Sequence, residues 1–245
     1  MKRNYALVTG GSSGIGQSAC VKLAACNYNI LINYNRNEAG ALETKRLVEE
    51  QNVEAELLQF DVSNADNVRE VLGTWIDSHP DQFIEILVNN AGSRNDNLMI
   101  FTSNEEWHKV LDLNLSSFFY VTKPVVKKMI LRKSGSIINI SSLSGVKGWQ
   151  GQVPYAAAKS GLIGASKSLA KELGRKNIRV NVITPGFIKT KMIADLKEEE
   201  YQSKTVLQRF GRPDEVGEMI AFLGTDKASF ISGQVISIDG GDFLH

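Results

Sequence analysis

Short apolar runs alternate with longer amphipathic segments along the whole chain. The apolar runs have the length of strands, and they lie at residues 5–8, 28–34, 55–60, 84–88, 136–140, 178–183 and 234–238. Between them, the spacing of apolar residues predicts helices at 17–26, 38–51, 104–132, 154–173 and 213–225, and a further helix that starts near Ser63. This alternation predicts an α/β fold in a single domain, with a doubly wound, seven-stranded parallel sheet and helices on both faces.

Two segments between these elements lack a clear strand or helix pattern. Residues 144–151 contain glycines at 145, 148 and 151 and are predicted to form a loop. Residues 189–204 carry Met192, Ile193 and Leu196 on one side and glutamates near the far end. The glutamates are typical of a solvated helix face, whereas the segment as a whole is a candidate for a mobile lid over a ligand.

Charge and cysteine content narrow the class of protein. The chain has 28 Lys and Arg against 27 Asp and Glu, so a net charge of +1 attracts it neither to nucleic acid nor to a membrane surface. The apolar run behind the basic start is too short for a secretory signal, and no run approaches the length of a membrane span. Cys20 and Cys26 are too far apart on one predicted helix to pair, and His79, His108 and His245 are not near them in sequence. We therefore expect a cytoplasmic protein with free thiols and no metal.

A glycine-rich turn follows the first predicted strand directly and precedes the first helix. In Thr9-Gly-Gly-Ser-Ser-Gly-Ile-Gly16, glycines 10, 14 and 16 suit a sharp turn, a close approach of backbone to a pyrophosphate, and tight packing of helix on strand. A helix N-terminus in this position offers backbone N–H groups to a phosphate, which indicates a dinucleotide. An ordinary tight turn without a ligand is the alternative, because the spacing differs from the commonest fingerprint.

The loops after the predicted strands should meet at one edge of the sheet. In a parallel sheet the carboxyl ends of the strands lie together, and ligands bind there. We expect the site to be built from residues 9–16, 33–36, 61–62, 89–92, 140–144 and 184–190.

A candidate catalytic set lies in the second half of the chain. Tyr155 and Lys159 are four apart on a predicted helix, so phenol and ammonium face the same way. A nearby ammonium, helped by an oxidised nicotinamide ring, lowers the pKa of a phenol towards the working range. Ser142, at the end of the fifth strand, is placed to donate a hydrogen bond to a substrate carbonyl, whereas Ser141 and Ser144 are interpreted as turn residues. Taken alone, a tyrosine and a lysine at this spacing also fit an ordinary amphipathic helix.

Asn114 is the fourth member of this set. It is polar among apolar neighbours in Asp112-Leu-Asn-Leu115, and it needs a hydrogen-bond partner if it is buried. An exposed helix residue is the alternative interpretation.

These motifs together resemble the short-chain dehydrogenase/reductase family, with its Rossmann-type fold, over nearly the whole chain. Within that family the chain is most similar to the β-ketoacyl-[acyl-carrier-protein] reductases, through the stretches 95–99, 114–117, 155–164, 185–188 and 211–213. The resemblance implies that Tyr155 protonates a ketone while the nicotinamide delivers hydride, and that Ser142 orients the carbonyl. Lys159 would hold the ribose and lower the pKa of Tyr155, and Asn114 would hold a relay water through its backbone.

The resemblance also implies a set of cofactor contacts along the carboxyl edge. Asp61 and Val62 would contact adenine, residues 90–92 the adenosine ribose side, and Ile188 with Thr190 the nicotinamide amide and the phosphates. The full expected set is Gly10, Ser12, Ser13, Gly14, Ile15, Gly16, Asn35, Arg36, Asp61, Val62, Asn90, Ala91, Gly92, Tyr155, Lys159, Pro185, Gly186, Ile188 and Thr190.

The end of the second predicted strand has no acidic residue. An acid there would pair with the ribose hydroxyls of NAD and repel a 2′-phosphate. The residues are instead Asn33-Tyr-Asn-Arg36, and an arginine suits a phosphate, so we expect NADPH/NADP+. Many members of the family carry a basic residue where Ser13 stands, so one cation is missing here. The alternative is that Arg36 is a loop residue in water that binds no phosphate.

Partners follow only from the resemblance. Lys133 and Lys176 stand where similar reductases use arginines to dock the acidic acyl carrier protein. Four further cations are nearby: Lys128, Arg132, Arg175 and Arg179. The alternative is that these residues stabilise the C-terminal ends of helices. A homotetramer and a 3-oxoacyl thioester substrate are expected. Reduction of another ketone (acetoacetyl-CoA, a polyketide, a steroid or a sugar) stays open, as does a non-catalytic sensor of NADP(H). Trp149 either narrows the substrate pocket or covers it.

Overall fold

The computed structural model describes residues 4–243, and its centre is a sheet of seven parallel strands. The strands run in the spatial order β3-β2-β1-β4-β5-β6-β7, which confirms the predicted sheet. They are β1 Tyr5–Val8, β2 Asn29–Tyr34, β3 Ala55–Gln59, β4 Ile84–Asn89, β5 Gly135–Ile140, β6 Ile178–Pro185 and β7 Val235–Ile238. The strand order reverses at β1, between its neighbours β2 and β4, and such a switch point opens a crevice at the carboxyl edge.

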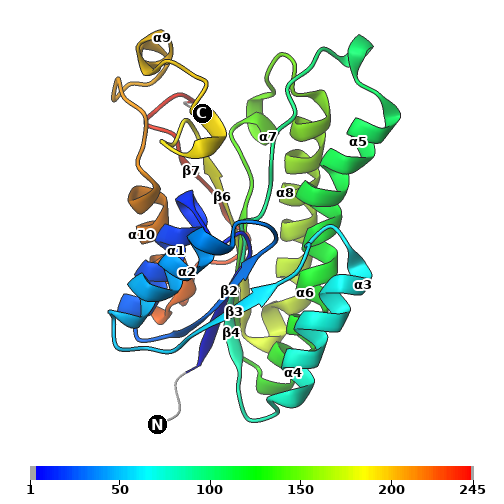
Figure 1. Cartoon of the computed structure of the whole chain (residues 1–245), viewed down its shortest axis with the longest axis vertical. Coiled ribbons are helices and arrows are strands. Elements are labelled where there is room, and N and C mark those ends of the chain that lie inside the picture. The colour runs from blue at the N-terminus through cyan, green and yellow to red at the C-terminus, as the bar shows by residue number, and fades with distance from the viewer. Residues whose placement is uncertain (1–3, 244–245) are drawn as a thin grey trace.

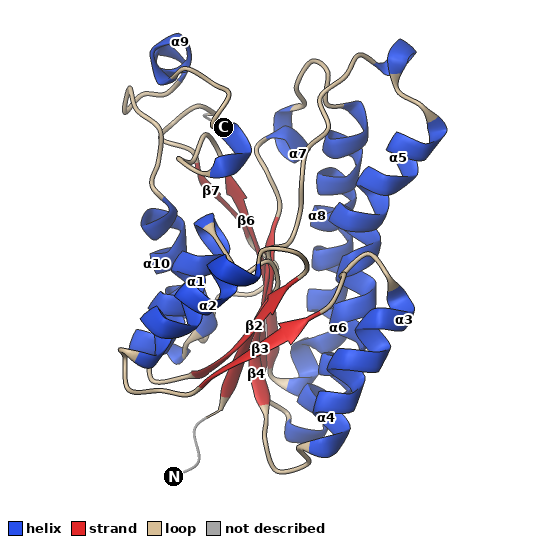
Figure 2. Cartoon of the chain, viewed as in Figure 1, coloured by secondary structure: helices blue, strands red, loops and turns tan. Residues whose placement is uncertain are grey.

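Helices cover both faces of this sheet (Figures 1 and 2). One face carries α1 Gly14–Ala25, α2 Glu38–Glu49 and α10 Pro213–Gly224. The other carries α3 Ala65–Val68, α4 Thr74–Ser78, α5 Asn104–Leu111, α6 Ser117–Arg132 and α8 Val153–Leu173. No helix among residues 4–243 is long and apolar enough to cross a membrane.

Two apolar clusters fill the spaces between the sheet and these helix layers. Alternate residues of one strand belong to different clusters: Ala6 and Val8 pack towards α1 and α10, whereas Tyr5 and Leu7 pack towards α4 and α6. Both faces of the central strands are therefore buried, which explains why these strands appear in the sequence as unbroken apolar runs.

The helix expected near Ser63 begins one residue later. Asp61 Oδ1 accepts hydrogen bonds from the backbone N–H and the hydroxyl of Ser63, at 2.9 and 2.6 Å. Asn64 therefore becomes the N-cap, and its side chain accepts from the N–H groups of Asp66 and Asn67. The helix then continues from α3 through a π-helical turn, Arg69–Gly73, into α4.

Two other segments differ from the sequence-based prediction. The loop expected at 144–151 starts with a short helix, α7 Ser144–Lys147, so that prediction is wrong for these four residues. The long helix expected at 104–132 is continuous, but a π-helical turn, Asp112–Ser116, joins α5 to α6. π-Turns are rare and often lie at functional sites. This one contains Asn114.

Candidate active site

The glycine-rich turn is fixed to the neighbouring strands by hydrogen bonds. Gly10 and Gly14 have φ angles of +63° and +54°, which only glycine adopts without strain. The Gly10 N–H donates to Asn33 Oδ1 at 3.2 Å, and Asn90 Nδ2 donates to the Thr9 carbonyl at 2.9 Å. The loops after β1, β2 and β4 therefore meet at the carboxyl edge, as predicted.

The start of α1 packs against this turn without space for a side chain. A Cβ at residue 16 would lie 2.2 Å from the Gly10 carbonyl oxygen. Ser13 is the N-cap residue, but its side chain makes no capping hydrogen bond to the helix. The backbone N–H groups of the first turn therefore remain available for an anion.

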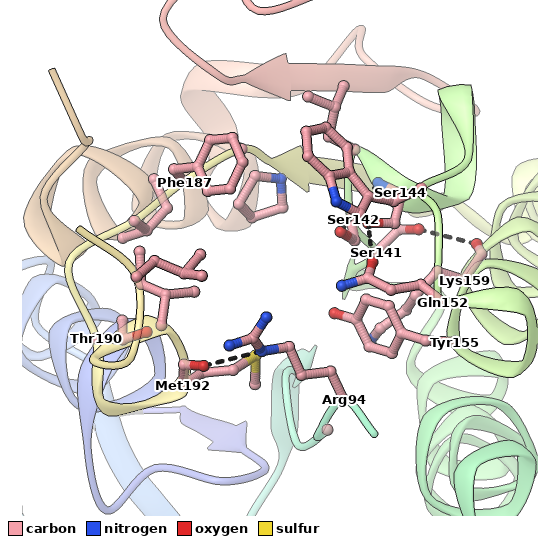
Figure 3. A pocket seen from close by; sticks show the side chains of 18 of the residues that line it. Arg94, Ser141, Ser142, Ser144, Gln152, Tyr155, Lys159, Phe187, Thr190 and Met192 are labelled. Atoms are coloured by element: carbon pink, nitrogen blue, oxygen red, sulfur yellow. Dashed lines mark hydrogen bonds between the residues drawn. The ribbon is translucent and has the colours of Figure 1, made fainter. Parts of the chain in front are cut away.

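Ser142, Tyr155 and Lys159 converge at the end of β5 (Figure 3). Tyr155 and Lys159 are buried on α8, with exposed fractions of 8% and 4%. Lys159 Nζ donates to the Ile140 carbonyl at 2.9 Å and lies 5.7 Å from the centroid of the Tyr155 ring. Ser141, interpreted from the sequence as a turn residue, donates its hydroxyl to the Lys159 carbonyl at 2.8 Å and so joins β5 to α8.

Burial sets the acid–base properties of these groups. Desolvation lowers the pKa of the Lys159 ammonium to about 8. Desolvation also raises the pKa of Tyr155, and a hydrogen bond with Ser142 acts in the opposite direction. The lowered phenol pKa expected from the sequence is thus not produced by the protein groups alone, because the desolvation of Tyr155 outweighs its hydrogen bond with Ser142.

Asn114 is buried, with 2% exposure, which excludes the interpretation as an exposed helix residue. Its Nδ2 donates to the carbonyls of Ser93 and Val110, both at 2.9 Å, while its Oδ1 has no hydrogen-bond partner among residues 4–243. A Cβ on Gly92 would lie 2.6 Å from that oxygen and 3.3 Å from Lys159 Nζ. A glycine is therefore required where Asn114 and Lys159 approach the loop after β4.

A cavity of about 260 Å³ opens beside these residues. The expected residues that line it are Ile15, Asn90, Gly92, Ser142, Tyr155, Lys159, Pro185, Gly186, Ile188 and Thr190. Ser12, Ser13 and Gly14 line an adjacent groove, which also contacts Thr190. Asn35 and Arg36 are exposed beyond β2, and Asp61, Val62 and Ala91 do not line the cavity beside Tyr155.

Residues 189–204 cover one side of the cavity. Met192, Ile193 and Leu196, which the sequence placed on one side of this segment, line the cavity. Glu199 and Glu200 are exposed, in agreement with a solvated face. Glu198 differs from these two, because it pairs with Lys189 at 2.9 Å and accepts from the Phe210 N–H.

Several residues of the cavity wall carry no signal in the sequence. Arg94 donates to the Met192 carbonyl and pairs with Asp96 and Asp195, so it joins the loop after β4 to segment 189–204 (Figure 3). Gln152 connects Ser144 to Asp96. These contacts span up to 101 residues of sequence, and no local motif marks them.

Aromatic residues form another part of the wall. Trp149 contacts Phe187 edge to face at a centroid distance of 5.7 Å, and Phe187 in turn packs on Tyr201. All three rings line the cavity. Trp149 is therefore part of the cavity wall.

The two expected docking lysines lie away from this site. Lys133 and Lys176 directly precede β5 and β6, at the amino edge of the sheet, and Asn177 Nδ2 donates to the Lys133 carbonyl. Tyr155 is near the start of α8, and this helix of 21 residues is about 30 Å long. Arg179 instead donates to the last carbonyls of α10, the helix-terminal role that the sequence left open.

The parallel sheet, the glycine turn, Ser142 and the buried Tyr155 and Lys159 define a dehydrogenase or reductase that uses a nicotinamide cofactor. The chain belongs to the short-chain dehydrogenase/reductase family, and the family profile that matches residues 10–242 is described as enoyl-(acyl carrier protein) reductase. A 3-oxoacyl-[acyl-carrier-protein] reductase of Synechocystis sp. is 42% identical over 237 residues, covering 96% of this chain and 95% of its own. Its counterpart from Chlamydia trachomatis is 42% identical over 239 residues and 96% of each chain.

A solved structure has the same fold. The crystal structure of a protein described as a short-chain alcohol dehydrogenase, from Sinorhizobium meliloti 1021, superposes with a TM-score of 0.91 at 35% identity. The match covers 99% of this chain and 97% of that one.

Proposed function

We propose that this protein reduces 3-oxoacyl-[acyl-carrier-protein] to 3-hydroxyacyl-[acyl-carrier-protein] with NADPH, as a step of fatty acid synthesis. The observation that carries the proposal is the buried Tyr155 beside Ser142 on the cavity wall, with Lys159 behind its ring. The names of the relatives from Synechocystis and Chlamydia supply the substrate class.

The proposed mechanism assigns one proton step to the chain's own residues. Ser142 donates a hydrogen bond to the ketone oxygen, and Tyr155 transfers its phenolic proton to that oxygen. A bound nicotinamide supplies the hydride that reduces the carbon. Lys159 then favours the phenolate electrostatically, because its ammonium lies close to the ring.

Asn114 supports the return of the proton. A cavity of about 10 Å³ lies between Asn114 and Lys159, and it is at the lower limit of the volume that one water occupies. We assign this space to a water held by the Asn114 backbone, through which Lys159 exchanges protons with solvent.

The cofactor assignment rests on the end of β2. Arg36 is exposed, and no ion pair involves it within residues 4–243, so its guanidinium is available to a 2′-phosphate. The start of α1, which has no capping side chain, supports a pyrophosphate at this turn. Asn35, Asp61, Val62 and Ala91 complete the proposed adenosine contacts.

The carrier protein is proposed to dock at Lys133 and Lys176. Because these lysines are about the length of α8 from Tyr155 of the same chain, a carrier bound there would deliver its substrate to a partner copy. This arrangement fits the proposed homotetramer.

The test follows the loss of NADPH absorbance with acetoacetyl thioesters of carrier protein and of coenzyme A, with NADH and a crotonyl thioester in parallel. Fast turnover of the carrier-bound 3-oxo substrate with NADPH is expected, without turnover of the crotonyl thioester. Turnover of the crotonyl thioester alone would instead assign the enoyl reduction that the family profile describes. No turnover of either oxo thioester, with NADPH still bound, would contradict the substrate assignment.

A further inference from the structure

The Arg94 side chain reaches from the loop after β4 to the opposite wall of the cavity. Figure 3 shows it pointing from the side of Tyr155 towards Met192. Its Nε donates to the Met192 carbonyl at 3.0 Å, and its Nη2 donates to Asp195 at 2.5 Å. Its Nη1 donates to Asp96 at 2.6 Å. The side chain is 17% exposed, and each of its three nitrogens has a partner.

The loop that carries Arg94 is fixed to the segment before α8. Asp96 Oδ1 accepts from Gln152 Nε2 at 3.0 Å, and Gln152 is buried. The Asn97 N–H donates to the Gly151 carbonyl at 2.8 Å. On this side of the cavity the guanidinium therefore has a firm support.

The opposite wall is fixed to its own side of the cavity, near two positions. The Lys189 N–H donates to the Gly211 carbonyl at 2.9 Å, and Glu198 pairs with Lys189 and accepts from the Phe210 N–H at 2.8 Å. We call residues 190–197, which lie between these two positions, the flap. Among the described residues, only Arg94 joins the flap to the loops after β4 and β5 by hydrogen bonds or ion pairs.

The contact between Arg94 and the flap is of a kind that breaks at low cost. Asp195 is 68% exposed, and an ion pair with a hydrated partner contributes little to stability. The flap lines the cavity with Met192, Ile193 and Leu196, so it covers a bound ligand while the contact is intact. Movements of such covering segments often limit substrate entry and product release.

We infer that Arg94 and Asp195 form a latch that holds the flap over the cavity, and that opening of this latch admits the substrate and releases the product. Arg94 is then a positioning residue, because it acts on the substrate through the flap. The inference takes its substrate from the proposed function, whereas the position of the flap can be measured without any turnover.

Five variants test the latch. Asp195→Ala, Arg94→Met and the double variant remove the contact, and Asp195→Glu keeps a carboxylate in place. Glu199→Ala is the matched control, because Glu199 is an exposed acid of segment 189–204 that lies outside the flap.

Limited trypsin digestion of the cofactor-free protein measures the position of the flap, with mass spectrometry to follow cleavage after Lys191 and Lys197. We expect Asp195→Ala and Arg94→Met to be cleaved about threefold to tenfold faster than wild type. The double variant should be cleaved no faster than Arg94→Met, because both changes remove the same contact. A direct effect of the lost carboxylate on trypsin would instead add to that of Arg94→Met. Asp195→Glu and Glu199→Ala should stay within about twofold of wild type.

Steady-state kinetics with the acetoacetyl thioester of N-acetylcysteamine measure the consequence for the substrate. Asp195→Ala should raise KM by about threefold to tenfold without lowering kcat more than about twofold, because the groups around Tyr155 are unchanged.

Wild-type cleavage rates in Asp195→Ala and Arg94→Met, or additive effects in the double variant, would overturn the latch. Faster cleavage with an unchanged KM would overturn its role in substrate entry. A lower kcat together with a lower Tm in Asp195→Ala would assign the pair a purely structural role. If the wild type does not reduce the thioester, the proposed function fails, whereas the cleavage rates still decide whether the latch exists.

Discussion

The Lys159 ammonium donates a hydrogen bond to the Ile140 carbonyl, at 2.9 Å, in a buried position. This contact ties α8 to the end of β5 and keeps the charge beside Tyr155 without a direct bond between the two side chains. The same burial lowers the pKa of Lys159 to about 8.

Lys159→Met should change the pH dependence of stability. Between about pH 8 and 10.5 the unfolded lysine still binds a proton that the folded protein releases, so wild-type stability rises with pH in this window. Across this pH window, the free energy of unfolding of the wild type should rise by up to about 3 kcal/mol relative to that of Lys159→Met. Urea unfolding of both proteins at pH 7.5 and 10 measures this gain; a difference between the two proteins that does not change with pH would contradict the lowered pKa.

Tyr155→Phe should remove turnover while cofactor binding stays. Loss of the proton donor is expected to lower kcat by at least about a hundredfold. NADPH fluorescence titration should give a Kd within about threefold of wild type. Tyr120→Phe, on α6, is the control and should keep full activity; unchanged kcat in Tyr155→Phe would refute the proton-transfer assignment.

Gly92→Ala should displace Asn114. The new methyl group would lie 2.6 Å from Asn114 Oδ1, and that side chain is held by two hydrogen bonds. We expect kcat to fall by about tenfold or more and stability by about 1–3 kcal/mol, from the disturbed buried amide. Gly73→Ala, where the nearest atom is 3.9 Å away, should not lower activity, and its stability should be equal or higher. If Gly92→Ala and Gly73→Ala have the same kcat, the position of Asn114 does not affect turnover.

Arg36→Ala tests the choice of cofactor. If the guanidinium binds the 2′-phosphate, KM for NADPH should rise by about tenfold or more, while KM for NADH changes by less than about twofold. Steady-state kinetics with both cofactors decide this. Arg69→Ala, another exposed arginine, is the control. Equal effects of Arg36→Ala on both cofactors would mean that this residue does not bind the phosphate.

The double variant Lys133→Glu/Lys176→Glu tests carrier docking. Reversed charge should repel the acidic carrier, so kcat/KM for the carrier-bound substrate should fall by about tenfold at low salt, and by less at high salt. The N-acetylcysteamine thioester should be reduced at the wild-type rate. Lys45→Glu, on α2, controls for net charge. If both substrates respond alike, the lysines do not form the docking surface.

Much of the fold was predictable from the sequence, because each buried strand is a short apolar run with a helix pattern behind it. The helix start at Asn64 was not predictable, because the Ser63 hydroxyl donates to Asp61 instead of capping the helix. The π-turn around Asn114 adds one residue to a helical turn, and an apolar stripe does not resolve that change. The short helix α7 was also not predictable, because the glycines in and around it are typical of a loop.

The candidate site was predictable where one local motif carries it, as for Tyr155 with Lys159 or the turn at Gly10. It was not predictable where distant segments meet. Arg94 reaches Asp195, and Lys147 reaches Asp242, across 101 and 95 residues. Such contacts depend on the arrangement of loops at the carboxyl edge, which no periodicity encodes.

The Asn33 side chain restricts how the cofactor preference of this protein can change. Its Oδ1 accepts from Gly10, and its Nδ2 donates to the carbonyls of Leu58 and Phe60. An aspartate here would have no donor for those carbonyls, and its charge would face them. If the protein uses NADPH as proposed, an acid that favours NADH should therefore be tolerated better at the exposed positions 35 and 36, where the new charge stays in water.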